Sequence, residues 1–138
     1  MPSLSGDDQA MTVPEDPRLH PRLRIRIRFD GDAFIGPGKA ELLERIAATG
    51  SIAAAARDMG MSYKRAWMIV ETLNAMFDTA LVDSARGGPG KGGATLTPRG
   101  RDVLAEYQAV ESAARDQNRD RLQRLQGWLR EAEKGQGD

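Results

Sequence analysis

The most regular pattern of hydrophobic and polar residues in this chain runs from Gly50 to Phe77. Apolar residues recur there at helical spacing in two successive segments. Ser51 and Ser62 each precede one segment as an N-cap, and Gly60 stands where the first helix would end in the left-handed conformation. The spacing predicts two helices joined by a tight turn, a helix-turn-helix. The apolar faces comprise Ile52, Ala55, Ala56 and Met59 in the first helix and Ala66, Ile69, Val70, Leu73, Met76 and Phe77 in the second.

Two further elements are predicted before this pair. Residues 22–29 alternate strictly between arginine and an apolar residue, which indicates a half-buried strand. Its arginine row could face water, pair with acidic groups of the chain or of a partner subunit, or meet DNA phosphates. The sequence alone leaves that role open. A helix is expected from about Lys39 to Ala48, with one face formed by Leu42, Leu43, Ile46 and Ala47.

The pattern after the helix pair predicts a wing. Residues 80–84 and 94–96 are typical of short strands. The loop between them is rich in glycine, and its only charged side chains are Arg86 and Lys91. Glycines would let this loop lie close to a groove of DNA.

A long helix is predicted to follow, with Thr97 as N-cap and Pro98 as its first residue. We expect its apolar seam to pair with the same seam in a second copy of the chain. The alternative is that the helix folds back over the three-helix unit. The predicted dimerisation residues are Val103, Tyr107, Val110 and Ala114; Leu122, Leu125 and Leu129 would continue the seam, and Trp128 would be a packing anchor.

These elements together predict a mainly α (α+β) fold. It would be a winged helix-turn-helix with an N-terminal strand, a two-stranded wing and a long C-terminal dimerisation helix. Residues 1–20 lack periodicity and are acidic and proline-rich, so a disordered leader is expected there. Residues 21–100 would form the winged domain, and residues 101–132 the dimerisation helix.

Charge is unevenly distributed along the 138 residues, although the net charge is zero. Residues 1–16 hold four acidic residues and no Lys or Arg, whereas residues 17–101 hold 14 Lys or Arg and 8 Asp or Glu. Residues 102–138 are mildly acidic again, with 6 against 8. The predicted winged domain is therefore the basic part of the chain, as a nucleic-acid-binding domain requires.

Composition also limits the chemistry that the chain can perform. It contains no cysteine, which excludes disulfides, thiolate metal sites and cysteine nucleophiles. The single histidine, His20, lacks a second member for a metal site or a catalytic triad. We therefore expect neither an enzyme nor a metal site, and no catalytic residue is predicted. No apolar run is long enough for a membrane span and no basic, apolar signal segment is present, so a cytoplasmic protein is expected.

The opening turn of the second helix of the pair is unusual in its charge. Lys64 and Arg65 follow Ser62 and Tyr63 directly, although cations at a helix N-terminus oppose the helix dipole. A phosphate backbone that meets this turn would compensate the cost through the free amides and the side chains. The alternative is a helical hairpin that only packs, with both cations in water.

Several motifs together resemble the N-terminal DNA-binding domain of ModE-type molybdate-dependent transcriptional regulators. That domain is itself similar to the winged helix-turn-helix of LysR-type regulators. The resemblance covers about Arg22 to Glu111. The motifs are Gly50-Ser51-Ile52 with Ala54-Ala55-Ala56, Met61 to Trp67, Leu73-Asn74, the loop Gly87 to Gly93, and Leu96-Thr97-Pro98-Arg99-Gly100.

The resemblance implies a recognition helix that opens at Ser62, a wing that reaches the flanking minor groove or backbone, and a dimer formed through the long fourth helix. In the full-length regulators molybdate binds to a C-terminal part built from small β-barrel modules. The sequence up to Asp138 contains nothing similar to those modules. No cofactor is therefore evident, and molybdate enters only by family association.

The sequence thus favours a sequence-specific transcriptional regulator that binds a two-fold DNA operator as a homodimer. The alternative is a winged-helix interaction module that docks another regulator through its arginine row and acidic leader without binding DNA. The operator sequence, the direction of regulation and any signal sensed are left open. The predicted DNA-binding residues are Ser51, Ser62, Tyr63, Lys64, Arg65, Arg86 and Lys91.

Overall fold

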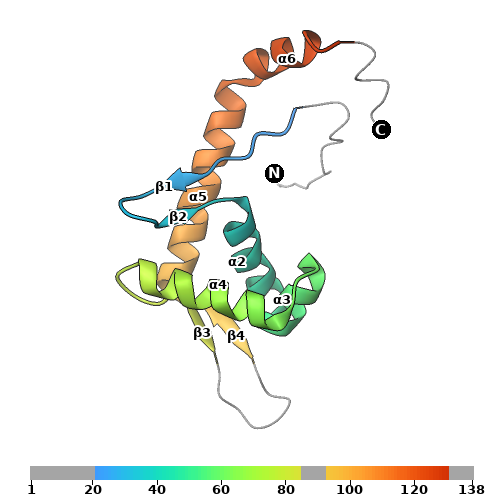
Figure 1. Cartoon of the computed structure of the whole chain (residues 1–138). Coiled ribbons are helices and arrows are strands. Elements are labelled where there is room, and N and C mark those ends of the chain that lie inside the picture. Colours follow the sequence, from blue (N-terminus) through green and yellow to red (C-terminus); the bar gives the residue numbers. More distant parts are fainter. Residues whose placement is uncertain (1–20, 85–92, 131–138) are drawn as a thin grey trace, which may run out of the picture. The chain divides into compact units, whose positions relative to one another are not determined.

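The computed structural model describes residues 21–84 and 93–130, which form a mainly α structure with two short antiparallel sheets (Figure 1). Residues Arg24–Ser112 make up one compact unit. In the described part of the chain, no helix has the length and apolar character required to cross a membrane. In chain order the elements are β1 (Ile27–Arg28), β2 (Phe34–Ile35), α2 (Pro37–Thr49), α3 (Ile52–Met59), α4 (Tyr63–Met76), β3 (Val82–Ser84), β4 (Ala94–Leu96), α5 (Pro98–Gln117) and α6 (Arg119–Gly127).

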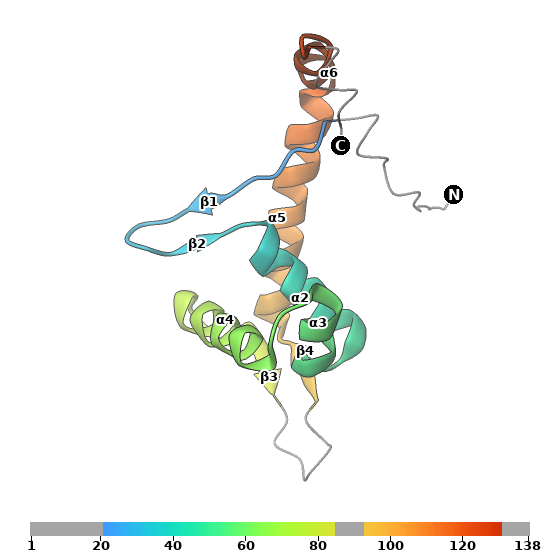
Figure 2. The ribbon, with the colours of Figure 1, turned by 45° about the vertical axis from the view of Figure 1, so that its right-hand side comes forward.

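The three-helix scaffold predicted from the sequence is confirmed. Helix α2 begins at Pro37, two residues before the expected start, because proline suits the first position of a helix. Helices α2, α3 and α4 surround a common core to which the two wing strands also contribute (Figure 2). Ala47, however, is exposed and not part of the inner face. The buried residues are Leu42, Leu43, Ile46, Ile52, Ala55, Ala56, Ala66, Val70, Leu73, Leu81, Val82, Ala94 and Leu96.

The predicted N-terminal strand is much shorter than expected. Only Ile27 and Arg28 pair with β2, because β2 is followed at once by Gly36 and by Pro37, which has no amide hydrogen to extend the ladder. The alternation of the sequence is nevertheless visible in the burial. Ile25 and Ile27 are half-buried, and the intervening arginines are exposed. Phe29 departs from the pattern because its side chain is 43% exposed.

A second, smaller core joins the β1–β2 hairpin to α5. Tyr107 is buried there with Ile35 and Ala40, and its hydroxyl donates to the carbonyl oxygen of Ile25. Burial raises the pKa of the Tyr107 phenol. Tyr107 therefore belongs to the interior of its own chain, and the prediction that it lies in a dimerisation seam is wrong. The tyrosine was assigned by helical spacing alone, which cannot show that a hairpin covers this face.

The remaining predicted seam residues differ in accessibility. Val103 is half-buried against the same small core, Ala114 is half-buried, and Val110 is 45% exposed. Val110 and Ala114 are thus the two predicted seam residues that lie outside the small core.

The long helix predicted for residues 101–132 is interrupted at Asn118. The side-chain amide of Asn118 donates to the carbonyl oxygen of Ala114 at 2.6 Å, and its backbone amide donates to Arg115 at 3.3 Å. A side-chain amide that donates to a backbone carbonyl oxygen in this way competes with the backbone amide that would bind the same oxygen in a regular helix. Helix α5 ends at Gln117 and α6 begins at Arg119.

Helix α6 has no buried residue. Leu125 is 56% exposed and Trp128 is 75% exposed. Trp128 is therefore not packed against the described residues of its own chain, and its role as a packing anchor stays a prediction.

Candidate nucleic-acid interface

Helix α3 and the turn after it are fixed by local hydrogen bonds. The Ser51 hydroxyl oxygen accepts from the Ala54 amide at 3.0 Å, as the predicted N-cap requires. At the other end Gly60 has a φ of 69°, and the amide of Met61 donates to Ala56 while that of Gly60 donates to Arg57. This is a Schellman ending, which needs a residue in the left-handed region. Residues 60–62 then suffice to redirect the chain into α4.

The first turn of α4 presents its polar side chains outward. The Ser62 hydroxyl oxygen accepts from the Arg65 amide at 3.1 Å, which leaves the hydroxyl hydrogen available to an external acceptor. Tyr63, Lys64 and Arg65 are all exposed, and this turn contains no acidic residue. Within the described ranges neither Lys64 nor Arg65 forms an ion pair. The turn therefore carries two cations that no carboxylate of the described residues neutralises.

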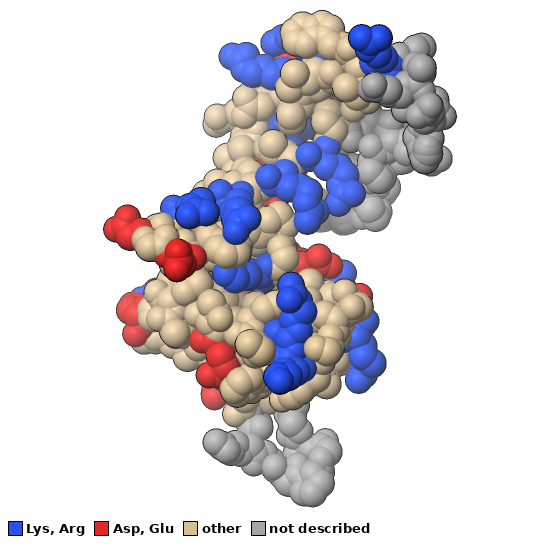
Figure 3. Space-filling view, viewed as in Figure 1, with Lys and Arg blue, Asp and Glu red and all other residues tan. Residues whose placement is uncertain are grey.

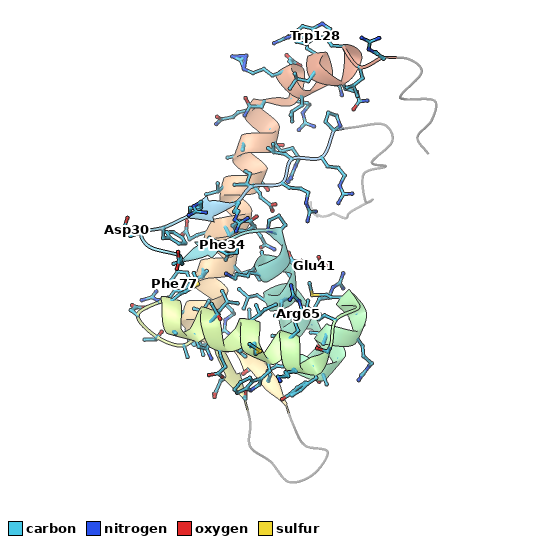
Figure 4. All side chains as sticks on the ribbon, viewed as in Figure 1. Asp30, Phe34, Glu41, Arg65, Phe77 and Trp128 are labelled. Carbon is cyan, nitrogen blue, oxygen red and sulfur yellow. The ribbon has the colours of Figure 1, made fainter. Side chains whose placement is uncertain are left out.

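A hollow of about 410 Å³ lies beside this turn, between α4 and the start of α2. Figure 3 shows Lys and Arg side chains over the face that carries β1, α2 and α4, and Figure 4 places Arg65 between the ribbons of α4 and α2. The hollow adds one cation that the sequence analysis missed, Lys39. No local motif marks Lys39, because only tertiary packing brings α2 to α4. The lining residues are Lys39, Ser62, Lys64, Arg65, Met68, Ile69 and Thr72.

Lys39 is held in place by β2. Its ammonium group donates to the carbonyl oxygen of Phe34 at 3.1 Å and lies 3.5 Å from the centroid of the Phe34 ring. Partial burial, and secondarily the positive charge of Arg26, lower the pKa of Lys39. The guanidinium of Arg26 lies 3.9 Å from the same ring centroid. Two cations thus share one aromatic side chain at the edge of the hollow.

The outer face of α4 is apolar as well as basic. Tyr63 is 53% exposed, Trp67 43% and Met68 54%. Trp67 and Met68 were not among the predicted site residues. The sequence did contain a signal for them. Helical spacing assigned Ala66, Ile69 and Val70 to the core-facing side, so the two apolar residues between Ala66 and Ile69 had to lie on the outer side. This face combines hydrogen-bonding groups with surfaces that could contact bases.

The root of the wing is anchored to α4 and α5. Strands β3 and β4 pair antiparallel from Val82 opposite Leu96 to Ser84 opposite Ala94. The Asn74 side chain accepts from the amides of Leu81 and Val82 at 2.8 and 3.0 Å. Both predicted strands are present, and the first begins at Val82, two residues later than expected. Arg86 and Lys91 lie outside the described residues.

In the part of the chain that the structure describes, no group of three or more His, Asp or Glu side chains is placed to hold a metal ion. The described site therefore consists of hydroxyl groups, cations and exposed apolar side chains.

The family model described as "Bacterial regulatory helix-turn-helix protein, lysR family" matches residues 38–101, from the second residue of α2 to the first turn of α5. These residues are thus similar to the helix-turn-helix domain of the LysR family. The resemblance noted in the sequence is thereby confirmed for this domain, as is its winged fold.

Curated proteins similar to this helix-turn-helix domain include MopB and ModE. The molybdenum-pterin-binding protein MopB of Rhodobacter capsulatus is 45% identical over 80 residues, which is 58% of this chain and 30% of that protein. The DNA-binding transcriptional dual regulator ModE of Escherichia coli K12 is 35% identical over 92 residues, 67% of this chain and 35% of that protein. The chain thus spans about a third of the length of these relatives. Among solved structures, the CbnR_DBD–DNA complex matches with a TM-score of 0.49 and 24% identity, covering 61% of this chain and 92% of that chain.

The helix-turn-helix domain brings together some of the predicted DNA-binding residues and separates others. Ser62, Lys64 and Arg65 line one hollow, whereas Tyr63 belongs to the outer face of α4. Ser51 is half-buried at the start of α3 and acts as its N-cap.

Proposed function

We propose that the chain is a transcriptional regulator that binds double-stranded DNA through the first turn of α4. The observation that carries this proposal is the exposed pair Lys64 and Arg65, which have no carboxylate partner in the described structure. Placing cations at a helix N-terminus costs about 0.3–1 kcal/mol, and a phosphate at that position would reverse the sign of the interaction.

Each side chain of the interface has a proposed role. Ser62 donates to a phosphate, and Tyr63, Lys64 and Arg65 meet base edges or phosphates. Trp67 and Met68 supply apolar contact, for which the methyl group of thymine is the natural partner in the major groove. Further contacts to the DNA backbone are proposed for Ser51 and for the wing residues Arg86 and Lys91.

We further propose that the regulator acts in the cytoplasm as a homodimer on a two-fold operator. Val110, 45% exposed, and Ala114 support an interface on α5. Two recognition helices on one face of DNA would lie about 34 Å apart, or a multiple of that distance. The relatives are named for molybdenum or ModE, so an influence of molybdate on DNA binding is the effector dependence to examine first.

Selection of bound sequences from a random DNA pool by the purified chain, with and without molybdate, tests the proposal. The expected result is an enriched site with two inverted half-sites. Retention on nonspecific DNA should also fall steeply with salt, because bound Lys and Arg release counterions from the phosphates. If no sequence is enriched and retention on nonspecific DNA is absent at low salt, the chain is an interaction module and the proposal fails.

A further inference from the structure

Cations from two separate elements surround the hollow between α2 and α4. Lys39 comes from α2, and Lys64 and Arg65 come from the first turn of α4. Among the described residues that line the hollow there is no carboxylate, but the hydroxyls of Ser62 and Thr72 are present. An anion that entered the hollow would be attracted by all three cations.

Some cations elsewhere in the described residues are neutralised locally. Arg45, on the same helix as Lys39, lies 3.8 Å from the carboxylate of Glu41. Arg119 lies 2.9 Å from Asp116. Within residues 21–84 and 93–130, Lys39 donates to a neutral carbonyl oxygen and lies over an aromatic ring, and it forms no ion pair. The hollow therefore brings three cations together without a carboxylate among its described lining residues.

The Lys39 ammonium is also positioned before any ligand arrives. An ammonium group has three donors, and the Phe34 carbonyl oxygen takes one of them at 3.1 Å. The ring of Phe34 restricts the group further, since it lies 3.5 Å from the ring centroid. Two donors remain for an incoming oxyanion, and less side-chain entropy is lost on binding than for a free lysine.

We propose that the hollow is a phosphate-binding site, in which Lys39 holds a phosphate of the DNA backbone beside the recognition helix. This inference rests on the proposed function. A phosphate suits the hollow because lysine acts as a compact point charge, while the nearby hydroxyls and Arg65 can donate to further oxygens. Such a contact carries no sequence information and instead fixes the register of α4 on the duplex.

The test compares Lys39→Gln with the wild type in DNA binding as a function of salt. Loss of one phosphate contact should reduce the slope of log affinity against log salt by about one, equally for specific and nonspecific DNA. Between about 50 and 200 mM salt, the advantage of the wild type over the variant should then shrink by roughly three- to fourfold. Lys39→Arg should restore the slope, because it keeps the charge.

Arg45→Gln is the matched control. It removes one positive charge from the same helix, but Arg45 faces Glu41 and does not line the hollow. Its salt slope should equal that of the wild type. Thermal melting of all variants shows whether each retains the fold, and the comparison is made among folded variants.

A second arm separates the two sources of phosphate. Inorganic phosphate should stabilise the wild type against heat less than DNA does, and Lys39→Gln should lose both effects in part. If the salt slope is unchanged but inorganic phosphate stabilises only the wild type and Lys39→Arg, the site binds a free anion. If Lys39→Gln equals the wild type both in the salt slope of DNA binding and in thermal stabilisation by inorganic phosphate, the proposed phosphate-binding site is wrong. Should Lys64→Ala still weaken DNA binding in that case, the proposed function would stand without the phosphate site.

Discussion

The first turns of α4 and α5 are built alike but use their cations differently. Each is capped by a hydroxyl that accepts from an amide three residues on, Ser62 from Arg65 at 3.1 Å and Thr97 from Gly100 at 3.0 Å. Each contains basic residues and no acidic residue. In α5, however, Arg99 binds the Asp78 carboxylate through two hydrogen bonds of 2.9 Å.

The difference shows that a cation in the first turn of a helix does not by itself indicate a binding site. Arg99 is also 3.2 Å from Asp102, and Arg101 donates to the carbonyl oxygen of Leu96 at 3.0 Å. The cations in the first turn of α5 therefore have partners within the chain, and their contacts connect α5 to Asp78 and to β4. Those of α4 lack carboxylate partners in the described ranges, which leaves them to an external anion.

The largest expected effect is on the α5 side, from Gly100→Ala. A Cβ atom at this position would lie 2.1 Å from the carbonyl oxygen of Leu81, so backbone would have to move. We expect a loss of unfolding free energy of about 3 kcal/mol or more. Urea denaturation measures it. In Gly127→Ala, where a Cβ atom meets nothing within 4 Å, the change should stay below about 1 kcal/mol. Equal stability of the two variants would contradict the assigned helix–strand contact.

The second-largest expected effect is weaker DNA binding by the variants Lys64→Ala and Arg65→Ala. Discrimination should fall by about 1–3 kcal/mol at one base position if the residue reads a base. If it contacts a phosphate, affinity should fall for all sequences and the salt slope should flatten. A mobility-shift titration with the selected site measures both. Arg99→Ala should bind as the wild type does, and wild-type affinity of the Lys64, Arg65 double variant would contradict the contrast between the two turns.

The smallest effect is a pH dependence of stability that only the α5 turn should show. The hydrogen bond from Arg99, more than its charge alone, lowers the pKa of Asp78. A carboxyl whose pKa is lower in the folded state stabilises the fold at pH values above its unfolded pKa of about 3.9, and this stabilisation is lost as pH falls through the lowered pKa. The stability gap between wild type and Arg99→Ala should therefore narrow from pH 7 to pH 3.

Urea unfolding at the two pH values measures that gap. Lys64→Ala serves as the control, because no carboxylate pairs with Lys64 in the described structure and its stability gap should not depend on pH in this range. A gap for Arg99→Ala that stays constant from pH 7 to pH 3 would show that the Asp78 pair does not contribute.

Local chemistry explains why much of the fold was predictable. The caps at Ser51 and Ser62 and the turn at Gly60 depend on residues within a few positions of each other, so their signals are complete in a short window. The wing strands pair residues 10 to 14 positions apart, and the glycine-rich segment between them marked the turn. The failures came where distant segments meet. The hairpin that covers Tyr107 follows from a contact to Ile25, 82 residues away in the chain, which no periodicity reports.

The sequence by itself determined the helix-turn-helix, the order of its elements and the cationic first turn of α4, because spacing, capping and charge are local properties. The tertiary structure alone decided which cations are neutralised and which residues share a site. Asp78 reaches Arg99 and Lys39 reaches the hollow beside Arg65 only after the chain has folded. The physical reason is that ion pairing and burial depend on distances in space, which separation along the chain does not fix.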